Sequence, residues 1–177
     1  MSSFLTILMI GISLSMDAFS LSLVFGMQGM STKDKIILSL IVGIYHYIMP
    51  LIGLSFGTIL DKVNLISIDI IASLILAYIG IDLILSNYKK EEPLEMNKLG
   101  FIIFGLSVSI DSLTVGIGLK AITNNYLISS IIFSLSSLIF TYLGLILGNI
   151  IGSKIGKYSK LIGGIILICI AIIMFIN

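Results

Sequence analysis

Long apolar stretches separated by short polar segments run through the whole chain. The hydrocarbon core of a bilayer, roughly 30 Å thick, is spanned by about 20 mostly apolar residues in a helix. Six stretches meet this requirement: 4–27, 36–59, 65–86, 99–121, 126–149 and 159–176. The pattern predicts an all-α integral membrane protein with six transmembrane helices. Its first stretch lacks a positively charged leader, so we expect it to be kept as a helix rather than cleaved.

The basic residues are divided unevenly between the two sides of this predicted bundle. All ten are lysines, and only Lys62 and Lys120 lie on the side of the second and fourth connections. Because cytoplasmic loops carry an excess of positive charge, the side with the other eight is predicted to be cytoplasmic, and both termini to lie outside. The eight are Lys33, Lys35, Lys89, Lys90, Lys98, Lys154, Lys157 and Lys160.

The two halves of the chain align with each other. Residues 12–20 match 106–114 at an offset of 94, and residues 51–57 match 142–148 at an offset of 91. Each half holds three predicted helices, so the second half would enter the membrane from the opposite side. We therefore expect one membrane domain, 1–177, built from two inverted repeats, as in many transporters. The repeats cover about 4–86 and about 99–176, and a cytoplasmic loop at 87–98 joins them.

Asp17 and Asp111 occupy equivalent positions near the middle of the first and fourth predicted helices. A charged side chain at this depth costs at least about 2.5–3.5 kcal/mol. No lysine or arginine lies deep in the spans to pair with either carboxylate. Protonation or a bound cation remain as the two ways to neutralise them.

Hydroxyl side chains share a helix face with each aspartate, because residues four before and three after a position lie beside it. With the carboxylates they would form an oxygen-rich site for a hard cation such as Mg²⁺ or Mn²⁺. Alternatively, the hydroxyls only bond a carbonyl of the preceding turn. The single histidine is a candidate ligand or proton carrier, or a buried packing residue. The predicted metal-binding residues are Asp17, Asp111, His46, Ser13, Ser20, Ser107 and Thr114.

Composition excludes several classes of function. The chain is 58% hydrophobic and 11% charged, with a mean hydropathy of +1.20. A net charge of +1 offers no basic surface for nucleic acid, and the single cysteine allows no disulfide framework. Residues 152–157 lack the spacing of a phosphate-binding loop. We expect a transporter rather than an enzyme, without a resident cofactor and driven by an ion gradient.

Three segments resemble the signature stretches of the bacterial manganese efflux pump family, MntP: residues 15–20, 46–53 and 109–116. The resemblance extends over essentially the whole chain. It implies export of Mn²⁺ across the bacterial cytoplasmic membrane, with Asp17 and Asp111 as the essential acidic residues. Members of the family carry Glu, Gln or His where His46 stands. Asp82 falls where the family varies, so the resemblance gives it no role.

The combined prediction is Mn²⁺ efflux by alternating access, coupled to proton entry. After the metal leaves, two neighbouring carboxylates would share one proton. One alternative is an exporter of amino acids or other small solutes, since the resemblance implies membership of a broader superfamily that includes the lysine exporter. Another is a non-transporting sporulation membrane protein, from a group that shares the Ser-x-Asp-Ser/Ala-Phe-Ser stretch. Oxygen ligands accept Fe²⁺, Cd²⁺ and Mg²⁺ as well, so the choice of Mn²⁺ rests on the resemblance.

Overall fold

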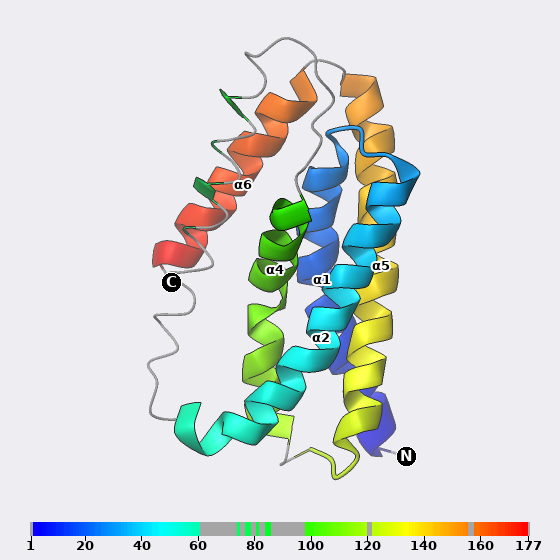
Figure 1. The fold of residues 1–177 in the computed structure, drawn as a ribbon, viewed down its shortest axis with the longest axis vertical. Coiled ribbons are helices and arrows are strands. Elements are labelled where there is room, and N and C mark those ends of the chain that lie inside the picture. Colours follow the sequence, from blue (N-terminus) through cyan, green and yellow to red (C-terminus); the bar gives the residue numbers. More distant parts are fainter. Residues whose placement is uncertain are drawn as a thin grey trace.

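The computed structural model describes residues 2–60, 98–119, 122–155 and 158–176, together with six isolated positions between 74 and 85. Every regular element in these ranges is a helix, which confirms the all-α prediction (Figure 1). The helices are α1 (Ser2–Gly26), α2 (Thr32–Leu60), α4 (Lys98–Gly118), α5 (Tyr126–Ile155) and α6 (Ser159–Ile176).

Five of the six predicted stretches coincide with these helices, and the largest difference is that α5 continues to Ile155 instead of ending at 149. Four of them, α1, α2, α4 and α5, contain segments long and apolar enough to cross a membrane. The predicted third stretch at 65–86, the loop at 87–98 and Asp82 lie almost wholly outside the described residues. The chain is therefore a multi-pass membrane protein, and its described residues contain four candidate crossings, in α1, α2, α4 and α5.

These four helices form the bundle that carries the candidate site. α1 packs mainly against α5, and α2 packs against both α4 and α5. In Figure 1, α1 and α5 run upward while α2 and α4 run downward, and α6 lies at the side of the bundle. The first and fourth predicted helices therefore run in opposite directions, as do the second and fifth.

The turn between α1 and α2 is defined by local hydrogen bonds. The Ser31 hydroxyl accepts the backbone N–H of Asp34 at 3.1 Å and donates to the Asp34 carboxylate at 2.6 Å. This reciprocal pair satisfies an N–H that the start of a helix leaves without a partner. Just before it, Gly29 adopts a φ of 82°, which glycine tolerates best. Together these residues reverse the chain and start α2.

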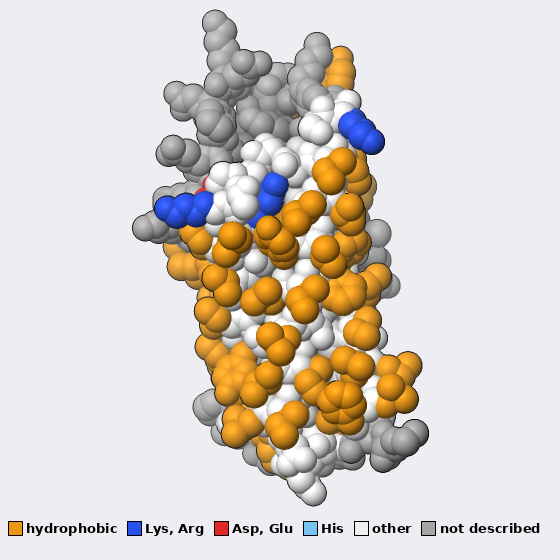
Figure 2. All heavy atoms as spheres, turned by 90° about the vertical axis from the view of Figure 1, so that its right-hand side faces the viewer, with side chains coloured by type: hydrophobic (Ala, Val, Ile, Leu, Met, Phe, Trp, Pro, Cys, Tyr) orange, Lys and Arg blue, Asp and Glu red, His pale blue; other side chains and the backbone are white. Residues whose placement is uncertain are grey.

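The outer surface of the bundle is apolar over most of its height. Large side chains such as Met9, Ile44, Leu135 and Ile150 are exposed, as expected for helices that face lipid rather than water. On the face shown in Figure 2, the hydrophobic side chains form a broad band, and the described lysines of that face lie above it at the upper end. This end contains the α1–α2 turn, where sequence reasoning placed cytoplasmic lysines.

Glycines bring the helices into close contact in two matching places. A Cβ added at Gly53 of α2 would overlap the carbonyl oxygen of Leu113 in α4. A Cβ added at Gly144 of α5 would lie 2.6 Å from the carbonyl oxygen of Phe19 in α1. Gly53 and Gly144 are 91 residues apart, and Phe19 and Leu113 are 94 apart, which are the two offsets of the sequence repeat. The same offsets relate the Gly11–Ile132 contact to the Gly105–Ile41 contact.

The contact between α2 and α5 joins two positions that correspond to each other in the sequence repeat. A Cβ added at Gly43 of α2 would lie 3.3 Å from the carbonyl oxygen of Ser134 in α5. These two residues are 91 apart, so each is the repeat partner of the other. Such a contact is expected where an approximate two-fold axis passes through the bundle.

Candidate metal-binding site

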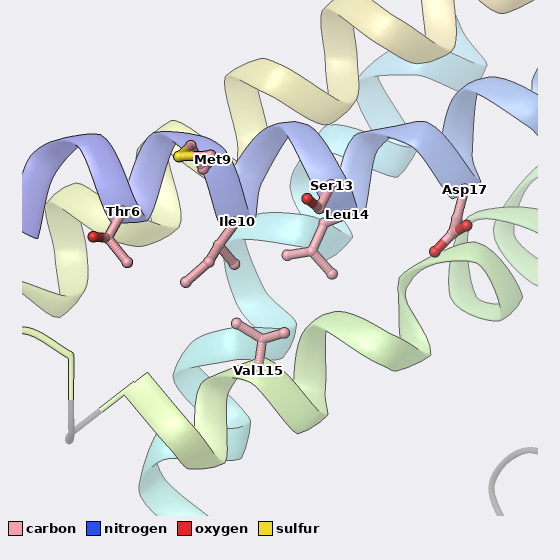
Figure 3. A pocket seen from close by; sticks show the side chains of 7 residues that line it. All are labelled: Thr6, Met9, Ile10, Ser13, Leu14, Asp17 and Val115. Atoms are coloured by element: carbon pink, nitrogen blue, oxygen red, sulfur yellow. The ribbon is translucent and has the colours of Figure 1, made fainter.

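The side chains of Asp17 and Asp111 meet between α1 and α4. Each lies near the middle of its helix, and the two carboxyl groups are within hydrogen-bonding reach of each other. Figure 3 shows Asp17 directed from α1 toward α4. In the part of the chain that the structure describes, neither carboxyl group is paired with a lysine. The two residues that sequence reasoning placed in one site are therefore brought together.

The two carboxyl groups have different surroundings. One carboxylate oxygen of Asp111 accepts the backbone N–H of Ser112 at 2.9 Å, and the Asp111 side chain is partly buried. Asp17 is exposed and lies at one end of a cavity of about 370 Å³. Of the two, Asp17 is thus the carboxyl group that is open to the cavity.

The cavity follows α1 from Asp17 toward the beginning of the helix (Figure 3). In Figure 1 this end of the bundle also holds the connection between α4 and α5. The wall is largely apolar, and the hydroxyls of Thr6 and Ser13 interrupt it. The lining residues are Thr6, Met9, Ile10, Ser13, Leu14, Asp17 and Val115.

The four predicted hydroxyl ligands fall into two groups. Ser13 lies on the cavity wall and Thr114 is exposed. The hydroxyl of Ser20 donates to the carbonyl of Met16 at 2.9 Å, and that of Ser107 donates to the carbonyl of Phe104 at 2.9 Å. These two bonds match the alternative in which the hydroxyls serve their own helix. A donating hydroxyl still has oxygen lone pairs, so the bonds do not prevent it from coordinating a metal.

His46 is fully buried in α2. Its Nδ1 lies 3.0 Å from the carbonyl oxygen of Val42, and its Nε2 is buried with no hydrogen-bond partner among the described residues. Within the described ranges, no three His, Cys, Asp or Glu side chains gather in one group. The structure therefore joins the two aspartates to each other, without His46 as a third member.

Sequence reasoning missed a set of buried hydroxyls on α1 and α5. The hydroxyl of Ser15 donates to the carbonyl of Gly11 at 2.6 Å and lies 3.3 Å from the hydroxyl of Ser137. Thr141, one turn beyond Ser137 on α5, is fully buried, and its hydroxyl has no partner among the described residues. Ser137 is the repeat partner of His46, since the two are 91 residues apart. Applying that offset to His46 would have found it.

Known proteins similar to this chain share one description. Residues 29–175 match the protein-family model Mntp, described as "Putative manganese efflux pump". A protein of Bacillus pumilus named "Putative manganese efflux pump MntP" is 34% identical over 170 residues, which cover 95% of this chain and 92% of that protein.

Two further relatives carry the same name. The Bacillus licheniformis protein is 32% identical, covering 93% of this chain and 89% of its own length. The Syntrophomonas wolfei protein is 30% identical, covering 95% of each chain. No solved structure matches this chain.

Proposed function

Since this chain belongs to the Mntp family, whose description is "Putative manganese efflux pump", we propose that it exports Mn²⁺ across the bacterial cytoplasmic membrane. The single observation that carries the proposal at the level of residues is the meeting of Asp17 and Asp111 between two membrane-spanning helices. Two acids at this depth, without a lysine partner in the described part of the chain, need a positive charge to neutralise them.

A divalent cation meets this need better than any other ligand. Two carboxylates offer four oxygens, the ligand type that Mn²⁺ and Mg²⁺ favour. Ser13, on the cavity wall, and Thr114, which is exposed, would add hydroxyl oxygens, and water in the cavity would complete the shell. Ser20 and Ser107 are weaker candidates, because each hydroxyl already donates to its own helix.

The proposed architecture is six transmembrane helices arranged as two inverted three-helix repeats. Two observations support it: equivalent helices run in opposite directions (Figure 1), and the contacts of α5 on α1 recur between α2 and α4 at the repeat offsets. In this arrangement the end with the α1–α2 turn faces the cytoplasm, and both termini lie outside. The aspartate pair then lies at the interface between the repeats, where transporters of this plan bind their cargo.

The proposed driving force is an inward flow of protons. When the metal leaves, two adjacent carboxylates cannot both stay charged at low energetic cost, so they share one proton. This exchange would couple each outward Mn²⁺ to protons moving in. The free Nε2 of His46 makes it a second candidate carrier.

The test of the proposed function is the metal content of cells, measured by mass spectrometry with and without the chain. We expect cells that express it to hold less manganese under manganese challenge, and those that express Asp17→Asn or Asp111→Asn to hold as much as cells without it. The matched control is Asp34→Asn, which removes a carboxylate from the first turn of α2, where the Asn side-chain oxygen can still accept the Ser31 hydroxyl. Unchanged manganese in cells with the intact chain contradicts the proposal, and protection against amino acids instead would favour the small-solute exporter.

A further inference from the structure

The residues that line the cavity beside Asp17 have repeat partners in the other half of the bundle. Every residue on its wall in α1 has a partner 94 positions later in α4, and the α4 residue on its wall has a partner 94 positions earlier in α1. The aspartates themselves are one such pair. The other pairs used here are Ile10 with Phe104, Ser13 with Ser107, Leu14 with Val108, and Val115 with Leu21.

The counterpart region is closed. Leu21, Phe104 and Val108 belong to one buried hydrophobic cluster, which also contains Phe25. The rings of Phe25 and Phe104 stack with their centroids 4.7 Å apart and an interplanar angle of 35°. Ser107 is only 7% exposed. Leu21, Phe104, Ser107 and Val108 are therefore all buried at the positions that match the cavity wall.

The two regions differ in the exposure of their serines, although both carry a serine at this position. Ser13 and Ser107 are the same residue at equivalent positions, yet Ser13 is exposed on a cavity wall and Ser107 is buried. The difference therefore lies in the side chains around each serine and in how the two halves pack. In an inverted repeat, the two halves can exchange conformations, which closes one end of the path and opens the other.

We propose that Leu21, Phe104, Ser107 and Val108 line a second half-path that opens toward the end of the bundle with the α1–α2 turn when Phe25 and Phe104 separate. The cavity beside Asp17 closes in that state, so the aspartate pair is open to only one end of the bundle at a time. The ring pair is then the gate on the side from which cargo enters. The direction in which cargo moves rests on the proposed function. The choice of residues rests on the observed cavity and the buried ring pair.

The test places a cysteine at position 13 or 107 and determines from which side of the membrane it reacts with a membrane-impermeant maleimide. The background is Cys169→Ala, which removes the only native thiol. Ser13→Cys and Ser107→Cys replace an oxygen with a sulfur, so both variants should fold. Two reporters mark the ends: Asn124→Cys in the α4–α5 connection and Thr32→Cys at the start of α2, both exposed positions. Labelling is measured in right-side-out and inside-out vesicles.

We expect Ser13→Cys to react from the same side as Asn124→Cys, and Ser107→Cys from the same side as Thr32→Cys. Adding Phe104→Ala should raise the labelling rate of Ser107→Cys by about tenfold or more, because a minor conformation is typically populated at roughly 0.1–10% and the change favours it. The repeat-matched control, Ile10→Ala, should not raise it. The reporters fix the orientation independently, so the outcome does not depend on which end is cytoplasmic.

Labelling of Ser107→Cys from the Ser13 side overturns the inference. So does an absence of labelling from either side even with Phe104→Ala, because the position is then buried in every state. The labelling uses no metal, so it can fail while manganese export holds, and manganese export can fail while the labelling pattern holds.

Discussion

Ser13 and Ser107 hold the same place in two matching helices, each one turn before an aspartate, but their surroundings differ. Ser13 lies on the wall of a cavity of about 370 Å³, and Ser107 is only 7% exposed, on the helix whose Phe104 packs against Phe25. The aspartates differ in the same sense, since Asp17 is exposed and Asp111 is partly buried. The same serine and aspartate pattern thus occurs once beside an open cavity and once in a buried region of the same bundle.

A second difference separates the halves, and here residue type does change. The buried His46 of α2 corresponds to Ser137 of α5, and Pro50 corresponds to the buried Thr141. α1 and α4 therefore repeat the acids and hydroxyls, whereas α2 and α5 share their packing glycines but differ at His46 and Pro50. The comparison teaches that the aspartate pair follows the sequence repeat, and that the histidine occurs in one half only.

The largest expected effect comes from removing either acid. Asp17→Asn and Asp111→Asn should each lower Mn²⁺ export by about 100-fold or more, because loss of even a secondary partner of a metal ligand costs roughly 10–100-fold. The measurement is Mn²⁺ flux in proteoliposomes with matched protein content. A large loss from one variant and none from the other would break the idea that both halves share the ion.

The next effect tests the matched helix contacts. Gly53→Val and Gly144→Val should each destabilise the protein by about 1–3 kcal/mol or more, since the added atoms meet the backbone carbonyls of Leu113 and Phe19. Thermal unfolding in detergent measures this. Gly118→Ala is the control, because a Cβ there meets nothing within 4 Å. Destabilisation at one glycine alone would show that the two contacts are not equivalent.

A smaller effect is expected at the position where α2 and α5 differ. His46→Gln should lower Mn²⁺ export by at most about tenfold, the lower end of the range for groups that act on a site indirectly, because His46 does not join the aspartates in one group. Flux measured against external pH separates its two candidate roles. A proton carrier would lose its pH dependence in this variant, and a packing residue would keep it. A loss as large as that of Asp17→Asn would place His46 beside the metal.

The smallest effect distinguishes the hydroxyls. Ser13→Ala should weaken the apparent affinity for Mn²⁺ by about 2- to 13-fold, the equivalent of one net hydrogen bond of roughly 0.5–1.5 kcal/mol. Ser20→Ala should leave the affinity unchanged, since that hydroxyl donates to the carbonyl of Met16. Flux measured over a range of Mn²⁺ concentrations checks both. Equal effects at the two serines would remove the distinction between the cavity wall and the outer helix face.

Apolar length and the repeat predicted most of what the structure describes. Five predicted stretches coincide with helices because a membrane-spanning helix must satisfy its own backbone within a long apolar run, which is plain in any sequence. The sequence also predicted the meeting of Asp17 and Asp111, from their matching positions near the middle of two equivalent helices. Of the six predicted crossings, those in α1, α2, α4 and α5 are long and apolar enough to span a membrane.

The details that sequence reasoning missed depend on which way each helix face turns. Helical spacing placed Ser20 and Ser107 beside the aspartates, but it does not tell a free hydroxyl from one bonded to its own helix. Helical spacing also gave no sign that Ser137 would meet Ser15, since only the repeat offset from His46 points to Ser137. The open and closed halves were not predictable, because identical serines occupy both and their burial depends on how the surrounding side chains pack.

Counting the Mn²⁺ ions bound to the purified protein tests the shared acid pair most directly. Electron paramagnetic resonance of free Mn²⁺ during a titration gives this number for the intact chain, Asp17→Asn, Asp111→Asn and the control Asp34→Asn. We expect a single tight site in the intact chain and the control, and loss of that site in both other variants. Tight binding that survives in either Asp17→Asn or Asp111→Asn would contradict the account.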